Sequence, residues 1–245
     1  MRSARRTTGL LAGVLAVAVG GCEQQSAPDT PQGVWSRIRA ACQQRDTGAV
    51  LELVDRRYAD DLGGVGRLED DLRQLFVVYG ALELELGGPR LDGGRLRGTA
   101  RVRGRALRYR GPLVLEFAAG PMGLLLRSGL LTDLRGVLAT LRQRRLALER
   151  GAIERLDAVM SMEYRGDGSG RRAVLDRLAE RLQRDRPPAL MVHRVDIRVE
   201  ADRAQVTQQV SWLAGGRKGT AERRDTERLT LRKEGTRWRI LAGLG

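Results

Sequence analysis

Three side chains, Tyr58, Asp60 and His193, are of the types that proton-transfer enzymes use. Proton transfer near neutral pH requires a carboxylate or an imidazole whose pKa is tuned by an apolar pocket. Their neighbours extend the set to three clusters, which are Tyr58 with Asp60 and Asp61, Tyr164 with Asp167, and His193 with Asp196. If one cluster lay inside a cavity, a reaction that depends on proton transfer would be the chemistry to expect.

Each cluster also has a structural interpretation. The two tyrosines follow short helices and can close the core with the hydroxyl reaching water. The aspartates of the first two clusters lie close to glycines, where Asp stabilises turns. By strand alternation His193 shares a face with Val195 and Ile197, which predicts a core histidine, whereas Asp196 falls on the opposite face.

The sequence lacks the residue patterns that other kinds of catalysis and cofactor binding require. The chain has one histidine, no Cys-x-x-Cys pair and no nucleophile motif, and the glycines of Gly63–Gly66 are not followed by Lys-Ser/Thr. We therefore predict no catalytic residue, no metal and no cofactor, with Tyr58, Asp60 and His193 as the alternative candidates.

The N-terminal residues have the pattern of an export signal. Arg2, Arg5 and Arg6 precede an uncharged run at residues 9–19, about half the length of a membrane-spanning helix. Val19-Gly20-Gly21-Cys22 resembles the bacterial lipobox. This resemblance implies a signal peptide at residues 1–21, acylation of Cys22 and a flexible tether at 22–32. Glu23 rather than Asp after the cysteine implies the periplasmic face of the outer membrane.

The chain is strongly basic, with a formal net charge of +14 carried almost entirely by arginine. The run Arg142–Leu146 and the cluster of Arg223, Arg224 and Arg228 are interpreted as solvated faces, with an anionic membrane surface as the alternative. Aromatic residues make up only 4% of the chain, so no nucleic-acid partner is expected. Cys42 is predicted to be a small buried residue.

The second half of the chain repeats the pattern of the first. A long helix, a short helix running into Tyr58 or Tyr164, a Gly-rich loop, an amphipathic helix and alternating strands occur in both halves. The second long helix is expected to begin at the cap candidate Thr132. The expected strands of the second half include residues 192–199, and its last two strands are expected to form a hairpin that turns at 233–235. The predicted fold class is α+β, with three helices on one face of about four antiparallel strands in each copy.

This order resembles the nuclear-transport-factor-2-like superfamily, which includes ketosteroid isomerase and SnoaL-like cyclases. The segment 227–240, in which a Gly turn leads to Trp-x-Ile on the last strand, carries the most specific similarity. The resemblance implies two tandem cone-like domains, 33–131 and 132–245, each with a curved sheet around a pocket. It also implies pairing through sheets, which a tandem chain can satisfy as a pseudo-dimeric monomer.

The leading hypothesis is a membrane-anchored envelope lipoprotein without catalytic activity. Its partners would be membrane lipid, through the acylated Cys22, and either a small apolar ligand or an envelope protein. The alternatives are Arg-mediated binding to anionic envelope components and an isomerase- or dehydratase-like enzyme. The ligand-pocket residues are left open by the sequence.

Overall fold

The computed structural model describes most of the folded part of the chain. The described residues are 30–121, 123–166, 168–184, 189–213 and 222–244. Cys22, the predicted signal peptide, most of the tether and Asp167 lie outside them.

The first half of the described chain begins with three helices. Thr30 caps the first helix by accepting a hydrogen bond from the Gly33 amide, and Pro31 occupies the first turn, where its missing N–H costs nothing. The elements are α1 (Pro31–Gln44), α2 (Thr47–Leu51), β1 (Ala59–Asp60), β2 (Gly63–Gly64), α3 (Val65–Tyr79), β3 (Glu83–Asp92), β4 (Arg95–Arg103), β5 (Leu107–Gly120) and β6 (Gly123–Ser128).

The second half has the same order of elements. They are α4 (Thr132–Glu149), α5 (Ile153–Ala158), β7 (Arg165–Gly166), β8 (Ser169–Gly170), α6 (Arg171–Arg184), β9 (Ala189–Glu200), β10 (Arg203–Leu213), β11 (Glu222–Glu234) and β12 (Arg237–Ala242). Thr132 is not the cap of α4: Leu131, in a left-handed conformation with φ of 51°, takes that position. The Thr132 hydroxyl instead donates to Asp60, 3.1 Å away.

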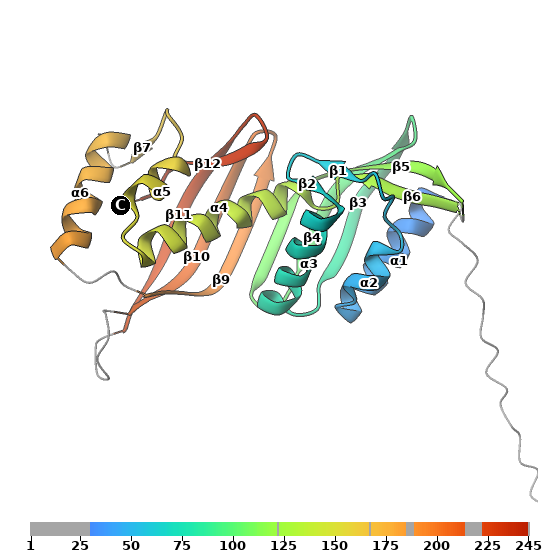
Figure 1. The fold of residues 1–245 in the computed structure, drawn as a ribbon, viewed down its shortest axis with the longest axis horizontal. Helices are drawn as coiled ribbons and strands as arrows, with labels where there is room; N and C mark the ends of the chain where they lie inside the picture. The colour runs from blue at the N-terminus through green and yellow to red at the C-terminus, as the bar shows by residue number, and fades with distance from the viewer. Residues whose placement is uncertain (1–29, 122, 167, 185–188, 214–221, 245) are drawn as a thin grey trace, which may run out of the picture.

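The long strands form one sheet of eight strands (Figure 1). Its order is β12-β11-β10-β9-β5-β4-β3, with β6 also paired to β5. Neighbouring strands within each half are antiparallel, whereas β5 and β9 pair in parallel, with Leu107 opposite Val195 and Arg110 opposite Arg198. The architecture is therefore α+β, with helices on a mixed, mostly antiparallel sheet.

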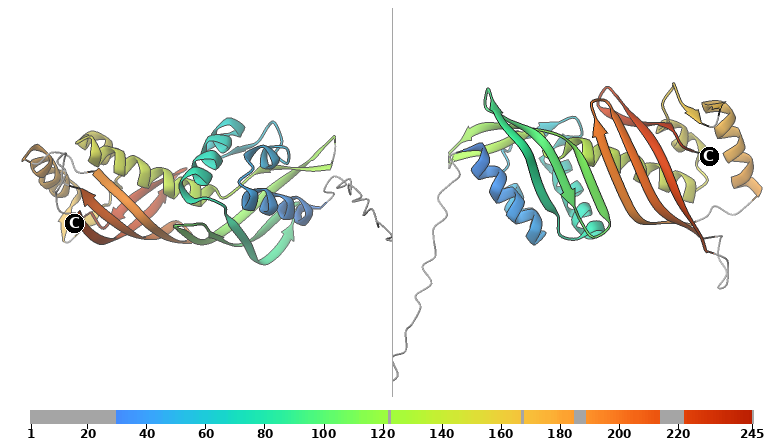
Figure 2. Two further views of the ribbon diagram at one scale, coloured as in Figure 1. Left: turned by 90° about the horizontal axis from the view of Figure 1, so that it is seen from below. Right: turned by 180° about the vertical axis from the view of Figure 1, so that it is seen from behind.

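The helices lie on one side of the sheet, and α4 runs along it from the first half into the second (Figures 1 and 2). Strand alternation matches this arrangement, since Val195, Ile197 and Val199 are buried toward the helices while Arg198 is exposed on the open side. One continuous hydrophobic cluster includes residues of both halves, and Cys42 is buried within it as predicted.

Each half contains a parallel bridge and a tyrosine hydroxyl contact at the equivalent place in its order of elements. Val54 forms an isolated parallel bridge with Leu126, and Met160 forms one with Ile240. The Tyr58 hydroxyl accepts from the Leu130 amide at 3.2 Å. In the second half, the Tyr164 hydroxyl accepts from the Leu244 amide at 2.9 Å.

Candidate functional site

Tyr58 and Asp60 meet in a buried polar network at the junction of the two halves. The Tyr58 hydroxyl donates to Asp60 Oδ2 at 2.6 Å, and Asp60 Oδ1 accepts from the Leu62 and Gly63 amides at 2.9 and 3.2 Å. The turn role predicted for Asp60 is thus present, and it is combined with a contact to the tyrosine. The Tyr58 hydroxyl does not reach water as expected, because the residue is only 2% exposed.

Arg135 of α4 completes this network. Its guanidinium donates to Asp60 Oδ2 at 2.6 Å, to Asp71 Oδ2 at 2.9 Å and to the Leu130 carbonyl at 3.2 Å. The side chains of Arg135 and Asp60 are 0% and 3% exposed. Since Asp60 and Asp71 belong to the first half and Arg135 to the second, this ion network joins the halves.

The network fixes the protonation states of its members. Burial opposes ionisation of Asp60, yet the Arg135 charge and the hydrogen bonds from Tyr58 and Leu62 hold its pKa below the usual value. Burial raises the pKa of Tyr58 well above its usual value. Asp60 therefore stays a carboxylate and Tyr58 a neutral phenol near pH 7. This arrangement favours a structural role over proton transfer.

His193 lies elsewhere, on β9, and the prediction that it is a core residue was wrong. The register between β9 and β10 shifts at Gln209 and Val210, so that Arg194 pairs with Gln209 and Val192 with Val210. His193 is the extra residue of this bulge and is exposed. Its Nε2 lies 2.6 Å from the Ser211 hydroxyl.

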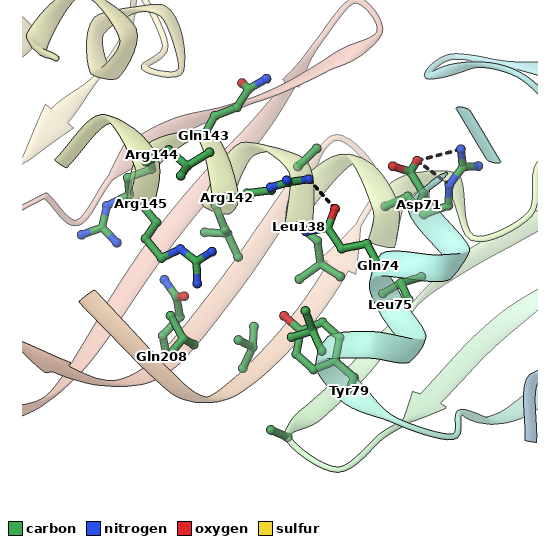
Figure 3. Close-up of a pocket in the computed structure, with 18 of the residues that line it drawn as sticks. Asp71, Gln74, Leu75, Tyr79, Leu138, Arg142, Gln143, Arg144, Arg145 and Gln208 are labelled. Carbon is green, nitrogen blue, oxygen red and sulfur yellow. Dashed lines mark hydrogen bonds and ion pairs between the residues drawn. The ribbon is translucent and has the colours of Figure 1, made fainter. Parts of the chain in front are cut away.

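A cavity of about 320 Å³ lies between α3, α4 and the strands β9 and β10 (Figure 3). Apolar side chains line much of this cavity. They include Leu75, Val78, Leu138, Leu141, Leu190 and Val192. Tyr58, Asp60 and His193 are not among its lining residues, so none of the predicted catalytic candidates faces it. Its one lining carboxylate, Asp71, is paired with Arg135 and Arg67.

The polar part of the cavity lining comes mainly from α4. Arg142, Arg144 and Arg145 line it together with Gln208 of β10 (Figure 3). Interpreting residues 142–146 as a solvated face was wrong for Arg144, which is 4% exposed. Its two terminal nitrogens bind Glu227 of β11 at 2.7 and 2.9 Å, because a buried guanidinium needs a carboxylate partner.

Sequence reasoning missed Arg135, Glu227 and Gln208. The sequence gives one weak sign that Arg135 and Arg144 are buried. Both arginines fall on the apolar face that the periodicity of the second long helix predicts. Arginines there require buried carboxylates, but the sequence does not indicate which ones.

The part of the chain that the structure describes offers neither a cluster of metal ligands nor a membrane-spanning helix. No group of three or more His, Cys, Asp or Glu side chains is placed to hold a metal ion in this part of the chain. None of the helices in the described ranges is long and apolar enough to cross a membrane.

No family model and no curated protein matches this sequence. Solved structures with a similar fold include a putative dehydratase from the NTF2-like family of Streptomyces avermitilis, with 18% identity, a TM-score of 0.40, and 46% of this chain and 94% of that chain covered. A putative scytalone dehydratase from Novosphingobium aromaticivorans has 15% identity and a TM-score of 0.42, over 46% of this chain and 82% of that chain. A putative ketosteroid isomerase from Shewanella frigidimarina has 15% identity and a TM-score of 0.37, over 43% and 89%. The likeness is one of fold, over about half of this chain.

Proposed function

We propose that this chain is an exported lipoprotein, anchored to the cell envelope through Cys22, that binds a small ligand without transforming it. Its folded part is two nuclear-transport-factor-2-like domains in tandem, residues 33–131 and 132–245. The two domains form a pseudo-dimeric monomer, joined by β5, β9 and α4. The location is the periplasmic face of the outer membrane.

The tandem arrangement is supported by contacts that repeat at a fixed spacing. Gly129 has φ of 92°, and a Cβ there would lie 1.8 Å from the Val114 carbonyl oxygen. Gly243 has φ of 100°, and a Cβ there would lie 2.0 Å from the Arg228 carbonyl oxygen. Both members of the second pair follow their counterparts by the same number of residues, as expected for two copies of one unit.

One observation carries the non-catalytic assignment. The cavity between α3, α4, β9 and β10 has a single lining carboxylate, Asp71, and that carboxylate is neutralised by Arg135 and Arg67. Acid–base catalysis needs a group that is free to exchange a proton with the substrate. The cavity volume of about 320 Å³ lies at the lower end of the range found for small-molecule sites.

The test uses Leu138, which lines the cavity, and Leu91, which is 55% exposed on β3. Full-length protein and the variants Leu138→Trp and Leu91→Trp are purified from the source membranes in mild detergent, and their organic extracts are analysed by mass spectrometry. We expect a stoichiometric small molecule with the wild type and Leu91→Trp and none with Leu138→Trp. The proposal would be contradicted if Leu138→Trp retained the molecule or if the protein converted the molecule to a product. It would also be contradicted if a stoichiometric protein partner co-purified and no small molecule did.

A second candidate function, binding to an anionic envelope surface, is favoured by the open face of the sheet. Arg101, Arg110 and Arg198 lie side by side there, because β4 pairs Arg101 with Arg110 and β9 pairs Arg198 with Arg110. Like charges directly opposite one another destabilise a sheet, and an anionic partner would relieve this repulsion. The three arginines line a shallow depression of about 730 Å³ together with Arg103 and Arg108.

This candidate predicts binding to phosphatidylglycerol vesicles that weakens as salt is added. Arg110→Glu should reduce the bound fraction much more than Arg177→Glu, an equal charge change at an exposed position of α6. Equal effects of the two variants, or binding that is indifferent to salt, would rule the open face out as the binding surface.

A further inference from the structure

Hydrogen-bond donors without acceptors gather at one end of the cavity between α3, α4, β9 and β10. Among the described residues, Gln208 Nε2, Arg144 Nε and Arg145 Nε are buried and have no hydrogen-bond partner. Gln208 is 3% exposed and Arg144 4% exposed, and both line the cavity (Figure 3). A buried donor left without an acceptor costs about 1–3 kcal/mol. Three such donors, two on α4 and one on β10, match a ligand that brings oxygen acceptors.

The charge of the lining points to an anion. Six arginines and one carboxylate line the cavity, the arginines being Arg67, Arg135, Arg142, Arg144, Arg145 and Arg194. Arg142, at the exposed edge of α4, bonds to the neutral amide of Gln74, and Arg145 has its carboxylate partner, Glu149, at 3.9 Å. Asp71, Asp60, Glu227 and Asp196 pair with the other four arginines. An anion held here would therefore meet mainly the positive charge of Arg142 and of the loosely paired Arg145.

The rest of the lining is apolar and continues to the surface. Leu75 and Val78 of α3 face Leu138 of α4 across the cavity, and Val78 is 53% exposed. An apolar chain or ring placed along this wall would remove the exposed part of Val78 from water.

Resting on the binding function proposed above, we infer that the ligand is a small amphipathic carboxylate. Its oxygens accept from Gln208 Nε2 and Arg145 Nε, with Arg144 adjacent, and its apolar body extends along Leu138 toward Val78. The small volume fits a single short chain or a ring system better than a two-chain lipid.

The experiment measures calorimetric affinity for octanoate, octanamide and octylamine in the full chain carrying Cys22→Ser, which removes the acylation site. We expect octanoate to bind at least about tenfold more tightly than octanamide, and octylamine not to bind, because a hydrogen bond to a charged group is stronger than one to a neutral group. Equal affinities for octanoate and octanamide, binding of octylamine, or no binding of any probe would overturn the inference.

Gln208→Leu and Gln209→Leu form a matched pair, since Gln208 faces the cavity and Gln209 is exposed on the other side of β10. Gln208→Leu removes a buried, unbonded donor, so the unliganded variant should fold and keep or raise its melting temperature. We expect its octanoate affinity to fall about ten- to hundredfold, while Gln209→Leu stays within about twofold of the wild type. An unchanged affinity in Gln208→Leu would overturn the inference.

Leu138→Trp separates failure of this inference from failure of the binding function. If octanoate and octanamide bind equally and both are lost in Leu138→Trp, the cavity binds ligands but does not select an anion. If Leu138→Trp binds every probe as the wild type does, the cavity is not the binding site and both proposals fail.

Discussion

Replacing Arg135 with methionine tests whether the buried ion network holds the two halves together. Arg135 has no exposed side-chain surface, and its removal leaves Asp60, 3% exposed, without its cation. Removing one partner of a buried ion pair costs about 3–5 kcal/mol, because the remaining charge stays desolvated. Asp71 also loses a partner but keeps Arg67 at 3.0 Å, so the Asp60 contact should account for most of the loss.

The pH dependence has a definite sign. The pKa of Asp60 is lowered in the folded chain, so its contribution to stability is present above the unfolded value of about 3.9 and is lost as the pH falls through the folded value. In Arg135→Met, burial acts without the cation and raises that pKa. The cost of the substitution should therefore be largest at pH 7 and should shrink as the pH falls, first through the raised pKa of Asp60 in the variant, above about 3.9, and then through its lowered pKa in the wild type.

The assay is urea unfolding of the full chain carrying Cys22→Ser, followed by circular dichroism at pH 7 and near pH 3.5. Arg177→Met, at an exposed position of α6, serves as the control and should change the free energy of unfolding by less than about 0.5 kcal/mol. Asp60→Asn combined with Arg135→Met should recover part of the loss, because no buried charge remains at that position. A loss below about 1 kcal/mol at pH 7, or a loss independent of pH, would refute the reasoning.

Three other predictions concern packing and reactivity. Gly136→Ala should lower the free energy of unfolding by about 1–3 kcal/mol, because the new Cβ would lie 2.7 Å from Trp238 Cδ1; an unchanged urea midpoint would contradict this. Gly129→Ala should cost about 3 kcal/mol by the same assay, since the methyl group would lie 1.8 Å from a carbonyl oxygen in a left-handed backbone. Burial raises the pKa of Cys42 to about 12, so in a Cys22→Ser chain its thiol should react with iodoacetamide more than about a hundredfold more slowly than after unfolding; mass spectrometry at pH 8 would detect early labelling that contradicts this.

The helices and strands could be predicted because each depends mainly on the pattern of apolar and polar residues within its own segment. The alternation of Val195, Ile197 and Val199 identified β9, and the periodicity after residue 131 identified α4. Tyr58 and Asp60 were grouped correctly because they are two residues apart beside a glycine turn. His193 was misplaced because strand alternation gives no sign of a bulge, which depends on pairing with β10.

The candidate site was beyond sequence reasoning because its parts are distant along the chain. Arg135 meets Asp60 across 75 residues, and Arg144 meets Glu227 across 83. The cavity itself is enclosed by α3 from one half and by α4, β9 and β10 from the other. A sequence pattern within one segment does not indicate how the two halves of the chain pack against each other. Neither the ion network nor the residues that line the cavity could therefore be derived from residue types alone.

The strand β5 has a consequence for self-association. Its first residues pair with β9 and its last with β6, so the backbone edge that the first half would otherwise present is occupied within the same chain. At one outer margin of the joined sheet, the register of β3 shifts around Pro89. At the other, β12 is short and carries Arg237 and Arg239. Interrupted pairing, proline and positive charge each discourage the addition of a further strand, so this sheet is protected against edge-to-edge aggregation between copies.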